Sequence, residues 1–344
     1  MDYCNLGKTN VTVPVMGVGT MLWLPNKKLT EDDLFQTYQA CLDQGMDFFD
    51  TAEIYGNGIS ESLIGKFHQR DGRKIKIATK FAPPSTMNPL TQKRKTVSND
   101  APKALLEALD GSLERLQTDC IDLYQMHTPP KNGRIADYMD VMAEAVYSGK
   151  VRAVGVCNFS KEQIQIAQDT LAKHDIPLAT AMTGYNILRR YPETNGVFEI
   201  CRKYGITVIP YAPLAEGTLT GKYRSGAQKV PIAYAITSYF GHLDLTKERN
   251  DNISLMKRIF SKPREIDIKR MEQIMEVMEQ IANTHEKTIA QVALNWLIST
   301  ENVHVLPIPG TKSIKQAHDN SGAADWKLTP DERDLICAAE EATR

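Results

Sequence analysis

The sequence predicts an α/β fold, a (β/α)8 barrel of the TIM-barrel architecture, in a single domain over residues 1–344. Two observations predict it: eight short apolar β segments alternate with helical patterns, and no shift in composition marks a domain boundary. Alternating elements of this kind imply right-handed β-α-β units and a parallel sheet, and eight strands close a barrel. Polar residues also interrupt several apolar runs at their C-terminal ends, where such barrels carry their chemistry.

The chain begins with β-branched residues on both sides of a polar turn, which predicts a hairpin before a first strand at about 15–20. From there helical patterns and apolar runs alternate. The predicted helices lie at 31–44, 60–70, 102–117, 135–148, 161–173 and 194–204. The strands that follow them lie at 46–50, 74–80, 121–127, 151–159, 178–186 and 206–213, and a last strand lies at 303–310.

The alternation breaks between the seventh and eighth strands, where more residues are present than one helix needs. Helices at 267–284 and 288–299 fill the second half, which leaves a long loop at 223–265. Loops of this length inside a compact domain are usually functional lids or locally disordered. The basic tract KRIFSKPRE in this loop is either a solvated face or a contact for a cofactor phosphate. Near the end, Thr329 and Pro330 predict the start of a closing helix that runs to about Ala342.

Charge and cysteine content disfavour several classes of protein. The 41 basic and 42 acidic residues provide no field for holding nucleic acid or an anionic membrane. The six cysteines are scattered, without a C-x-x-C pair or zinc-site spacing, which fits reduced thiols in a cytosolic protein. No apolar run approaches membrane-spanning length, and the N-terminus lacks a signal-peptide pattern. We therefore expect a soluble, cytoplasmic protein without a metal site, whose oligomeric state the sequence does not indicate.

The common nucleotide-binding and hydrolase motifs are absent. Gly17 and Gly19 are not followed by the third glycine of a G-x-G-x-x-G fingerprint, which disfavours a Rossmann fold. GTLTGKY at 217–223 has neither the spacing nor the Ser or Thr of a phosphate-binding P-loop. No G-x-S-x-G elbow is present, and His285 has no second histidine at metalloprotease spacing.

Polar side chains at the predicted strand ends indicate acid–base chemistry. Asp50 ends one apolar run, Lys80 and His127 end two others, and Tyr55 follows Asp50 by five positions. Alone, each would usually be structural, since an Asp at a strand end is often a cap or turn former. Held together at one rim, the lysine stabilises a phenolate and lowers the pKa of the tyrosine, while the aspartate keeps the lysine charged. Tyr55 can then donate a proton, and His127 can orient a carbonyl oxygen.

The chain resembles the aldo-keto reductase superfamily over essentially its whole length, in particular the long-chain branch with a PIPG motif. The resemblance rests on DTAEIYG with Glu61 and Ile64-Gly65 downstream, ATK ending at Lys80, His127, GVCNFS, PYAPLAEGTLTGKY and LPIPGTKSIKQAHDN. It implies a (β/α)8 barrel closed at its base by the N-terminal hairpin, which binds NADP(H) in an extended pose without a Rossmann domain. It also implies an oxidoreductase that acts on CH-OH or carbonyl groups of a small-molecule substrate.

The resemblance also implies a role for individual residues. The family's catalytic tetrad matches Asp50, Tyr55, Lys80 and His127. Asn158 matches the residue that holds the nicotinamide carboxamide, and Tyr211 matches the aromatic residue that stacks on the nicotinamide ring. Pro213, Leu214, Gly217 and Leu219 match the segment along the pyrophosphate, Gly310, Thr311 and Lys312 the 2′-phosphate site, and Gln316 and Asn320 the adenine contacts. The remaining implied cofactor contacts are Gly19, Thr20, Met21, Asp50, Met182, Gly221 and Lys222.

Two residues depart from the family pattern beside Asn158. Cys157 stands where the family commonly has Ser, and Met182 where it commonly has Gln. Thiol and thioether groups are weak hydrogen-bond partners. We therefore expect cofactor binding to depend more on stacking against Tyr211 and on Lys312, whose position before a helix N-terminus suits a phosphate. Asp319 also stands where many members have Glu.

The predicted function is NADPH-dependent reduction of an aldehyde or ketone to the alcohol by hydride transfer, with Tyr55 as the proton donor. The reverse oxidation stays open. One alternative is a regulatory protein that holds the cofactor for a partner, as the β subunits of potassium channels do. Another is a barrel aldolase that uses Lys80 as a Schiff-base nucleophile. The residues Met21, Trp23, Phe81 and 234–240 either favour a hydrophobic carbonyl substrate or reflect ordinary loop packing.

Overall fold

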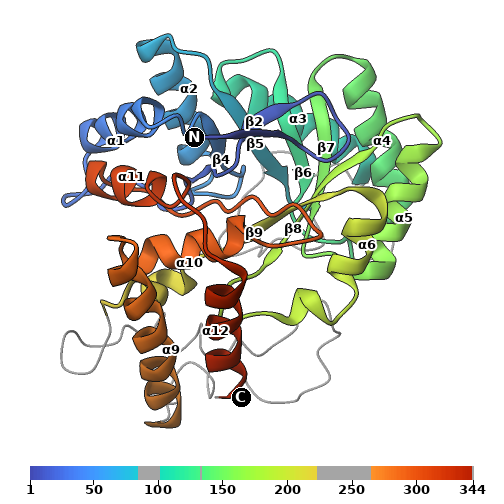
Figure 1. The fold of residues 1–344 in the computed structure, drawn as a ribbon. Helices are drawn as coiled ribbons and strands as arrows, with labels where there is room; N and C mark the ends of the chain where they lie inside the picture. The colour runs from blue at the N-terminus through green and yellow to red at the C-terminus, as the bar shows by residue number, and fades with distance from the viewer. Residues whose placement is uncertain (84–100, 132–133, 223–264, 343–344) are drawn as a thin grey trace.

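The computed structural model describes residues 1–83, 101–131, 134–222 and 265–342, without the side chains of 101–103 and 265–271. It has an α/β architecture in which a curled parallel sheet is surrounded by helices (Figure 1). The loop predicted at 223–265, with its basic tract and its segment 234–240, lies outside the described residues apart from Glu265, where a helix begins.

Seven parallel strands follow one another around the sheet in chain order. Several are buried along their whole length, as expected for parallel strands that are covered on both faces. Asp50 pairs with Ala78 on the next strand, and Lys80 with Gln125 on the one after, so the C-terminal ends of these strands share one rim. The strands are β3 (Val18–Gly19), β4 (Phe48–Asp50), β5 (Lys76–Phe81), β6 (Ile121–Met126), β7 (Val151–Cys157), β8 (Leu178–Gly184) and β9 (Thr207–Tyr211).

The eighth predicted strand, 303–310, closes the ring without forming a continuous strand. Isolated parallel bridges join Val305 to Val208 on one side and Gly310 to Gly19 on the other. The segment accepts hydrogen bonds from Gly17 N–H at the Pro307 carbonyl, 3.0 Å, and from Val208 N–H at the His304 carbonyl, 2.8 Å. Pro307 has no backbone N–H to donate in return, and neither has Pro309. The prolines therefore explain why this segment does not extend its bridges into a strand.

The predicted N-terminal hairpin covers the N-terminal ends of the barrel strands. Strands β1 (Tyr3–Asn5) and β2 (Thr12–Pro14) pair antiparallel. In the turn between them, Gly7 N–H donates to Thr207 Oγ1 at the start of β9, 2.9 Å away. A Cβ at Gly7 would lie 2.6 Å from the Ala179 carbonyl oxygen near the start of β8, so this close approach requires glycine. The hairpin thus plugs the end of the barrel opposite the rim that carries Asp50 and Lys80.

The helices form an outer layer whose starts are set by capping residues. Thr30, Ser160, Thr288 and Thr329 each form a capping box. The predicted start of the closing helix at Thr329 and Pro330 is confirmed. The helices are α1 (Glu31–Asp43), α2 (Ile59–Asp71), α3 (Ala101–Leu116), α4 (Ile135–Tyr147), α5 (Lys161–Ala172), α6 (Val197–Tyr204), α9 (Glu265–Thr284), α10 (Ile289–Ile298), α11 (Ile314–Ser321) and α12 (Pro330–Glu341).

The helix predicted at 194–204 is shorter than expected. A separate 3-10 turn, η2 (Tyr191–Glu193), precedes it, and α6 starts only at Val197. Gly196, at the N-cap of α6, has a φ of 89°, so the chain turns through a left-handed conformation before the helix begins. A second 3-10 segment, η3 (Ala215–Thr220), follows β9.

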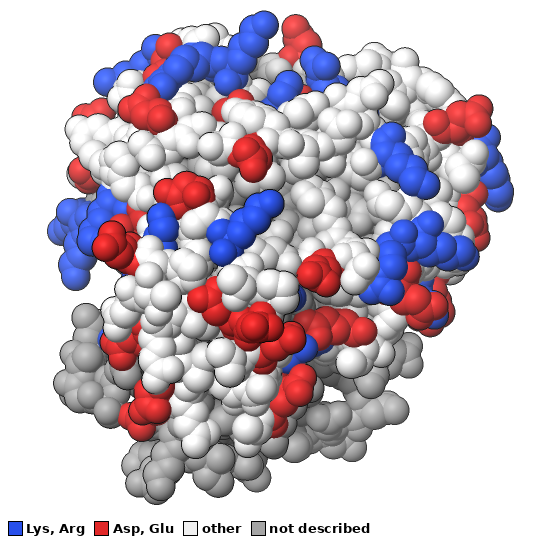
Figure 2. Space-filling model, in the orientation of Figure 1, with Lys and Arg blue, Asp and Glu red and all other residues white. Residues whose placement is uncertain are grey.

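The surface carries charges of both signs. In Figure 2 basic and acidic side chains are interspersed over the face shown. Across the described part of the chain, the helices are all too short or too polar to span a lipid bilayer.

Candidate active site

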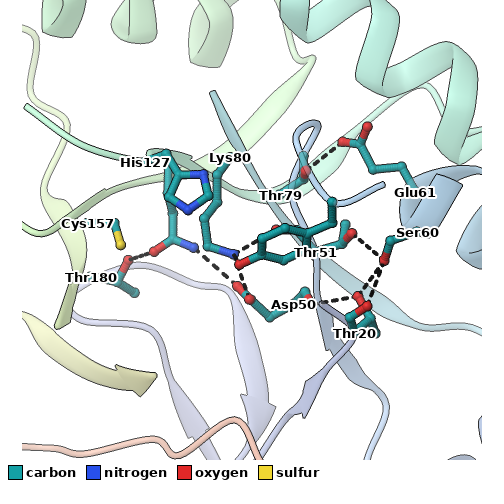
Figure 3. A network of polar contacts seen from close by, with 12 residues as sticks. Thr20, Asp50, Thr51, Ser60, Glu61, Thr79, Lys80, His127, Cys157 and Thr180 are labelled. Carbon is teal, nitrogen blue, oxygen red and sulfur yellow. Dashed lines mark hydrogen bonds and ion pairs between the residues drawn. The ribbon is translucent and has the colours of Figure 1, made fainter. Parts of the chain in front are cut away.

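Asp50, Lys80 and His127 lie together at the C-terminal rim of the sheet (Figure 3), and the hydroxyl of Tyr55 lies 3.5 Å from Lys80 Nζ. Asp50 is the last residue of β4, Lys80 is near the end of β5, and His127 directly follows β6. Tyr55 lies in the turn between β4 and α2, where its N–H donates to the Ala52 carbonyl at 3.0 Å. Parallel pairing of three successive strands thus places side chains that are 77 positions apart in sequence at one site.

Asp50 and Lys80 form a buried ion pair. Lys80 Nζ donates to Asp50 Oδ1 at 2.6 Å and to the Thr51 carbonyl at 2.7 Å, and Lys80 is fully buried. Burial alone would lower the pKa of Lys80, but the charge and hydrogen bond of Asp50 outweigh it and raise the pKa. Burial also raises the pKa of Asp50 against the pull of Lys80. Because a lone buried ammonium would be strongly disfavoured, the short contact indicates that both groups are charged.

Tyr55 points its hydroxyl at this pair. Its Oη lies 3.5 Å from Lys80 Nζ, at the outer limit of a hydrogen bond. The predicted lowering of the Tyr55 pKa is wrong in its net direction: burial raises the pKa, and the Lys80 charge offsets only part of that rise. The sequence shows the neighbouring lysine but not the extent of burial. The phenol therefore keeps its proton at neutral pH, as a proton donor must.

His127 completes the cluster as a neutral imidazole. Burial, and secondarily the charge of Lys80, lower its pKa to about 3. Its ring meets the Tyr55 ring edge to face, with centroids 5.9 Å apart. Nδ1 is buried and has no hydrogen-bond partner among the described residues. A neutral histidine carries one N–H donor and one acceptor, so it can hydrogen-bond the oxygen of a carbonyl placed beside Tyr55.

Lys80 is unsuited to act as a nucleophile. A Schiff base requires the neutral amine, whereas the Asp50 contact keeps Lys80 protonated. This electrostatic environment disfavours the aldolase alternative.

A second layer of polar contacts was not singled out from the sequence. Gln125 Nε2 donates to Asp50 Oδ2 at 3.4 Å, and Gln125 Oε1 accepts from Thr180 Oγ1 at 3.3 Å. Both residues are fully buried, and Figure 3 shows Thr180 beside Cys157. The signal was present, because Gln125 is a polar residue in an apolar strand and shares a strand face with His127, two positions on.

Asn158 is held at the rim by the two residues that depart from the family pattern. Its N–H donates to the Met182 carbonyl at 2.9 Å, and its backbone has a left-handed φ of 63°. Its side-chain Nδ2 lies 3.2 Å from Cys157 Sγ and donates to the His127 carbonyl at 3.2 Å. Burial raises the pKa of Cys157 to about 12, so the thiol stays neutral. The side-chain amide of Asn158 is therefore placed by one backbone carbonyl and one neutral thiol.

The segment after β9 has an unusual backbone. Ala212, Ala215 and Glu216 all have positive φ angles between 46° and 52°. Non-glycine residues seldom adopt this conformation, and such outliers concentrate at functional sites. Gly217 has a φ of 89°, and a Cβ there would collide with the Lys222 side chain. The structure places the predicted contacts Pro213, Leu214, Gly217, Leu219, Gly221 and Lys222 in or beside this segment, after Tyr211 at the end of β9.

The last predicted cofactor stretch lies against the first strand. Gly19 N–H donates to the Pro309 carbonyl at 3.0 Å, and Thr311 N–H donates to the Gly19 carbonyl at 3.4 Å. Lys312 is exposed, and its N–H donates to Gln316 Oε1 at 2.8 Å just before α11. Gly310 and Thr311 thus adjoin Gly19, which Thr20 and Met21 follow in the chain, and Lys312 and Gln316 follow at the start of α11.

Two residues of this stretch make internal contacts through their side chains. Thr20 is fully buried, and its Oγ1 donates to the Asp50 carbonyl at 2.8 Å. Asn320 is also buried and donates to Thr311 Oγ1 at 3.0 Å. The two side chains therefore stabilise the backbone at Asp50 and the side chain of Thr311.

Two proposed substrate-pocket residues belong to the core instead. Trp23 is fully buried, donates from Nε1 to the Thr311 carbonyl at 2.7 Å, and packs against the rings of Phe49 and Phe67. Phe81 is also fully buried and packs against Tyr138. Ordinary packing is the correct interpretation for both. Met21, in contrast, is 56% exposed.

Comparisons with known proteins agree with this geometry. The family described as "Aldo/keto reductase family" matches residues 15–341. The chloroplastic pyridoxal reductase of Arabidopsis thaliana is 32% identical over 97% of the chain and 85% of its own length. An NADP(+) aldo-keto reductase, yakc, of Schizosaccharomyces pombe is 32% identical over 93% of the chain and 86% of its own length.

Solved structures show the same fold. The glycerol dehydrogenase of Gluconobacter oxydans superposes with a TM-score of 0.79 at 24% identity, over 99% of the chain and 96% of that protein. A thermostable aldo-keto reductase bound to the inhibitor epalrestat superposes with a TM-score of 0.71 at 25% identity, over 98% of the chain and 100% of that protein. These likenesses confirm the predicted TIM-barrel fold.

Proposed function

The chain belongs to the aldo/keto reductase family, and on this premise we propose that it is an NADPH-dependent reductase that converts an aldehyde or ketone to the alcohol. The observation that carries the proposal is the position of Lys80, 2.6 Å from Asp50 and 3.5 Å from the Tyr55 hydroxyl. This arrangement supplies a protonated phenol with a permanent cation beside it. Such a pair supports proton donation to a carbonyl oxygen better than it supports a purely structural role.

The rim residues fit an extended nicotinamide dinucleotide. Asn158 would hold the carboxamide, and Tyr211 would stack on the nicotinamide ring. The left-handed turns around Gly217 would let the backbone approach the pyrophosphate closely. Lys312, exposed before the N-terminus of α11, would meet the 2′-phosphate. When bound, the reduced nicotinamide supplies a hydride to the carbonyl carbon.

Tyr55 would then donate its phenolic proton to the carbonyl oxygen, which completes the alcohol and leaves a tyrosinate. Lys80 would stabilise that anion, because its ammonium group remains charged beside the oxygen. His127, neutral and without a partner for Nδ1 among the described residues, would orient the carbonyl oxygen toward Tyr55. A proton from solvent would restore the phenol for the next turnover.

The test is NADPH oxidation by the purified protein with a panel of aldehydes and ketones, with NADH as the control cofactor. Pyridoxal belongs in the panel because an Arabidopsis relative is named for its reduction, and glycerol belongs in the reverse assay. We expect turnover with NADPH, and weaker turnover with NADH because NADH has no phosphate for Lys312. A protein that retains NADPH through purification yet turns over no carbonyl compound would instead be a cofactor-holding regulatory protein.

A further inference from the structure

Arg189 is a buried arginine whose guanidinium has no acceptor among the described residues. It retains 5% of its accessible surface, and its Nε is fully buried without a hydrogen-bond partner among the described residues. No described carboxylate forms an ion pair with it. Arginine is almost never buried to this extent without a partner, because an uncompensated buried charge is strongly disfavoured.

The guanidinium lies at the mouth of the barrel. A Cβ built on Gly184 would meet Arg189 Nη1 at 2.7 Å and Tyr211 Cε2 at 3.1 Å. Side chains alternate along a strand, so Gly184 shares its face with Met182, which packs inside the barrel with Cys157. The absent side chain of Gly184 therefore leaves the space that Arg189 occupies, on the inward side of the C-terminal rim. Tyr211, at the end of β9, forms the neighbouring wall.

The adjacent arginine shows what pairing looks like in this fold. Arg190 contacts Glu193 at 2.8 Å, Glu341 at 3.1 Å and Glu340 at 3.7 Å. Arg189, one position earlier in the chain, contacts none of these three glutamates. The contrast indicates that Arg189 is kept for a group that is not part of the described chain.

The turn that carries Arg189 is tightly constrained. Arg189 and Asn186 exchange backbone hydrogen bonds of 2.9 Å and 3.2 Å. Asn186 Nδ2 in turn donates to the Ala212 carbonyl at 2.9 Å, which ties the turn to the residue after Tyr211. The guanidinium is thus held in advance of binding, so little conformational entropy would be lost when a ligand arrives.

We propose that Arg189 is a specificity-determining residue that binds an anionic group, a carboxylate or a phosphate, on the carbonyl substrate. This inference rests on the proposed reductase function. Arginine suits the role because its planar guanidinium offers paired donors to both kinds of oxyanion. The charge adjoins Tyr211, where the cofactor would present its uncharged carboxamide end, whereas the pyrophosphate track runs along 213–221. A substrate anion is therefore the better match than a cofactor phosphate.

The test compares matched pairs of aldehydes that differ in one anionic group. Benzaldehyde is paired with para-carboxybenzaldehyde, and glyceraldehyde with its 3-phosphate, so that the two arms distinguish carboxylate from phosphate. We expect the wild type to favour at least one anionic member by kcat/KM, and Arg189→Gln to lower that preference by about 10- to 100-fold, the effect of one charged hydrogen bond. Arg189→Lys keeps the charge but loses the paired donors of the guanidinium. Its preference for the anionic aldehyde should lie between those of the wild type and Arg189→Gln.

Arg190→Gln is the matched control, since it removes the same charge one position away and should leave the preference unchanged. NADPH affinity, followed by fluorescence, is measured for every variant. A preference that Arg189→Gln leaves unaltered overturns the inference, and so does a loss confined to NADPH affinity, which would assign the guanidinium to the cofactor. Binding of benzoate and inorganic phosphate by calorimetry tests the site without turnover: weaker binding to Arg189→Gln supports the inference even if no aldehyde is reduced, and equal binding to both proteins opposes it.

Discussion

Lys80 Nζ lies closer to Asp50, at 2.6 Å, than to the Tyr55 hydroxyl, at 3.5 Å. The ammonium group is thus anchored by the carboxylate and faces the phenol without a strong hydrogen bond to it. A tyrosinate formed during turnover would shorten that contact, since the charged form binds a cation better than the neutral phenol does. Lys80 is therefore already in place to stabilise the tyrosinate when it forms.

Replacing Tyr55 with Phe removes the hydroxyl and retains the ring that meets His127. We expect carbonyl reduction to fall by at least about 100-fold, the lower range for loss of a positioned acid, while NADPH affinity changes by less than about 2-fold. Steady-state kinetics and fluorescence titration measure the two effects. Wild-type turnover by this variant would show that another group donates the proton.

Asp50→Asn is expected to destabilise the protein through Lys80. The substitution leaves a fully buried ammonium without its counter-ion, which costs about 3–5 kcal/mol of unfolding free energy. Urea denaturation measures the loss. Asp110→Asn is the matched control, because it breaks an exposed 2.6 Å pair with Lys150 and should cost less than about 1 kcal/mol. Equal effects of the two substitutions would mean that the buried pair contributes no more than a surface pair.

The low pKa of His127 links stability to pH. Its pKa is about 3 in the folded protein against 6.5 for the ordinary group, so the unfolded state binds more protons between these values. The contribution of neutral His127 to the unfolding free energy is fully present above pH 6.5. It is lost as the pH falls toward 3, with a slope of up to about 1.4 kcal/mol per pH unit. His127→Gln should flatten the stability curve in that window relative to wild type. Parallel curves for the two proteins would rule out a buried neutral histidine.

Met182→Gln restores a polar companion beside Asn158. We expect NADPH binding to tighten by about 0.5–1.5 kcal/mol, the net value of one added hydrogen bond. Calorimetric titration of NADPH gives the affinity, and urea denaturation checks that the buried amide has not destabilised the barrel. A gain well below about 0.5 kcal/mol would count against the expectation that cofactor binding depends more on Tyr211 and Lys312 because Asn158 lacks a polar companion here.

The sequence predicted the barrel and the positions of the rim residues because apolar runs mark where strands end. It did not predict the net pKa shift of Tyr55, since burial depends on the whole fold. Nor could it separate Trp23, which is core, from Met21, which is exposed, because both follow the same strand. Arg189 and Arg190 are identical neighbours in sequence, and only the fold gives Arg190 three carboxylates while Arg189 has none among the described residues. Local sequence patterns do not show which side chains from distant elements contact each other.

Gly155→Ala tests whether the inner polar layer is as closely packed as its contacts indicate. A Cβ at Gly155 would collide with Thr180 Oγ1 and lie 2.9 Å from Gln125 Cγ, so the methyl group must displace the side chains behind Asp50. We expect a loss of about 1–3 kcal/mol in unfolding free energy, typical of overpacking a core, together with reduced turnover.

Thr180→Ala should recover part of that loss in the double variant, because it removes the atom that the new methyl group meets most closely. Gly310→Ala is the matched control for stability, since nothing lies within 4 Å of a Cβ there. Urea denaturation of the four proteins and wild type measures the coupling. If the losses of unfolding free energy from the Gly155 and Thr180 substitutions simply add, the new methyl group does not press on Thr180. The contacts among Thr180, Gln125 and Asp50 would then be less closely packed than their distances indicate.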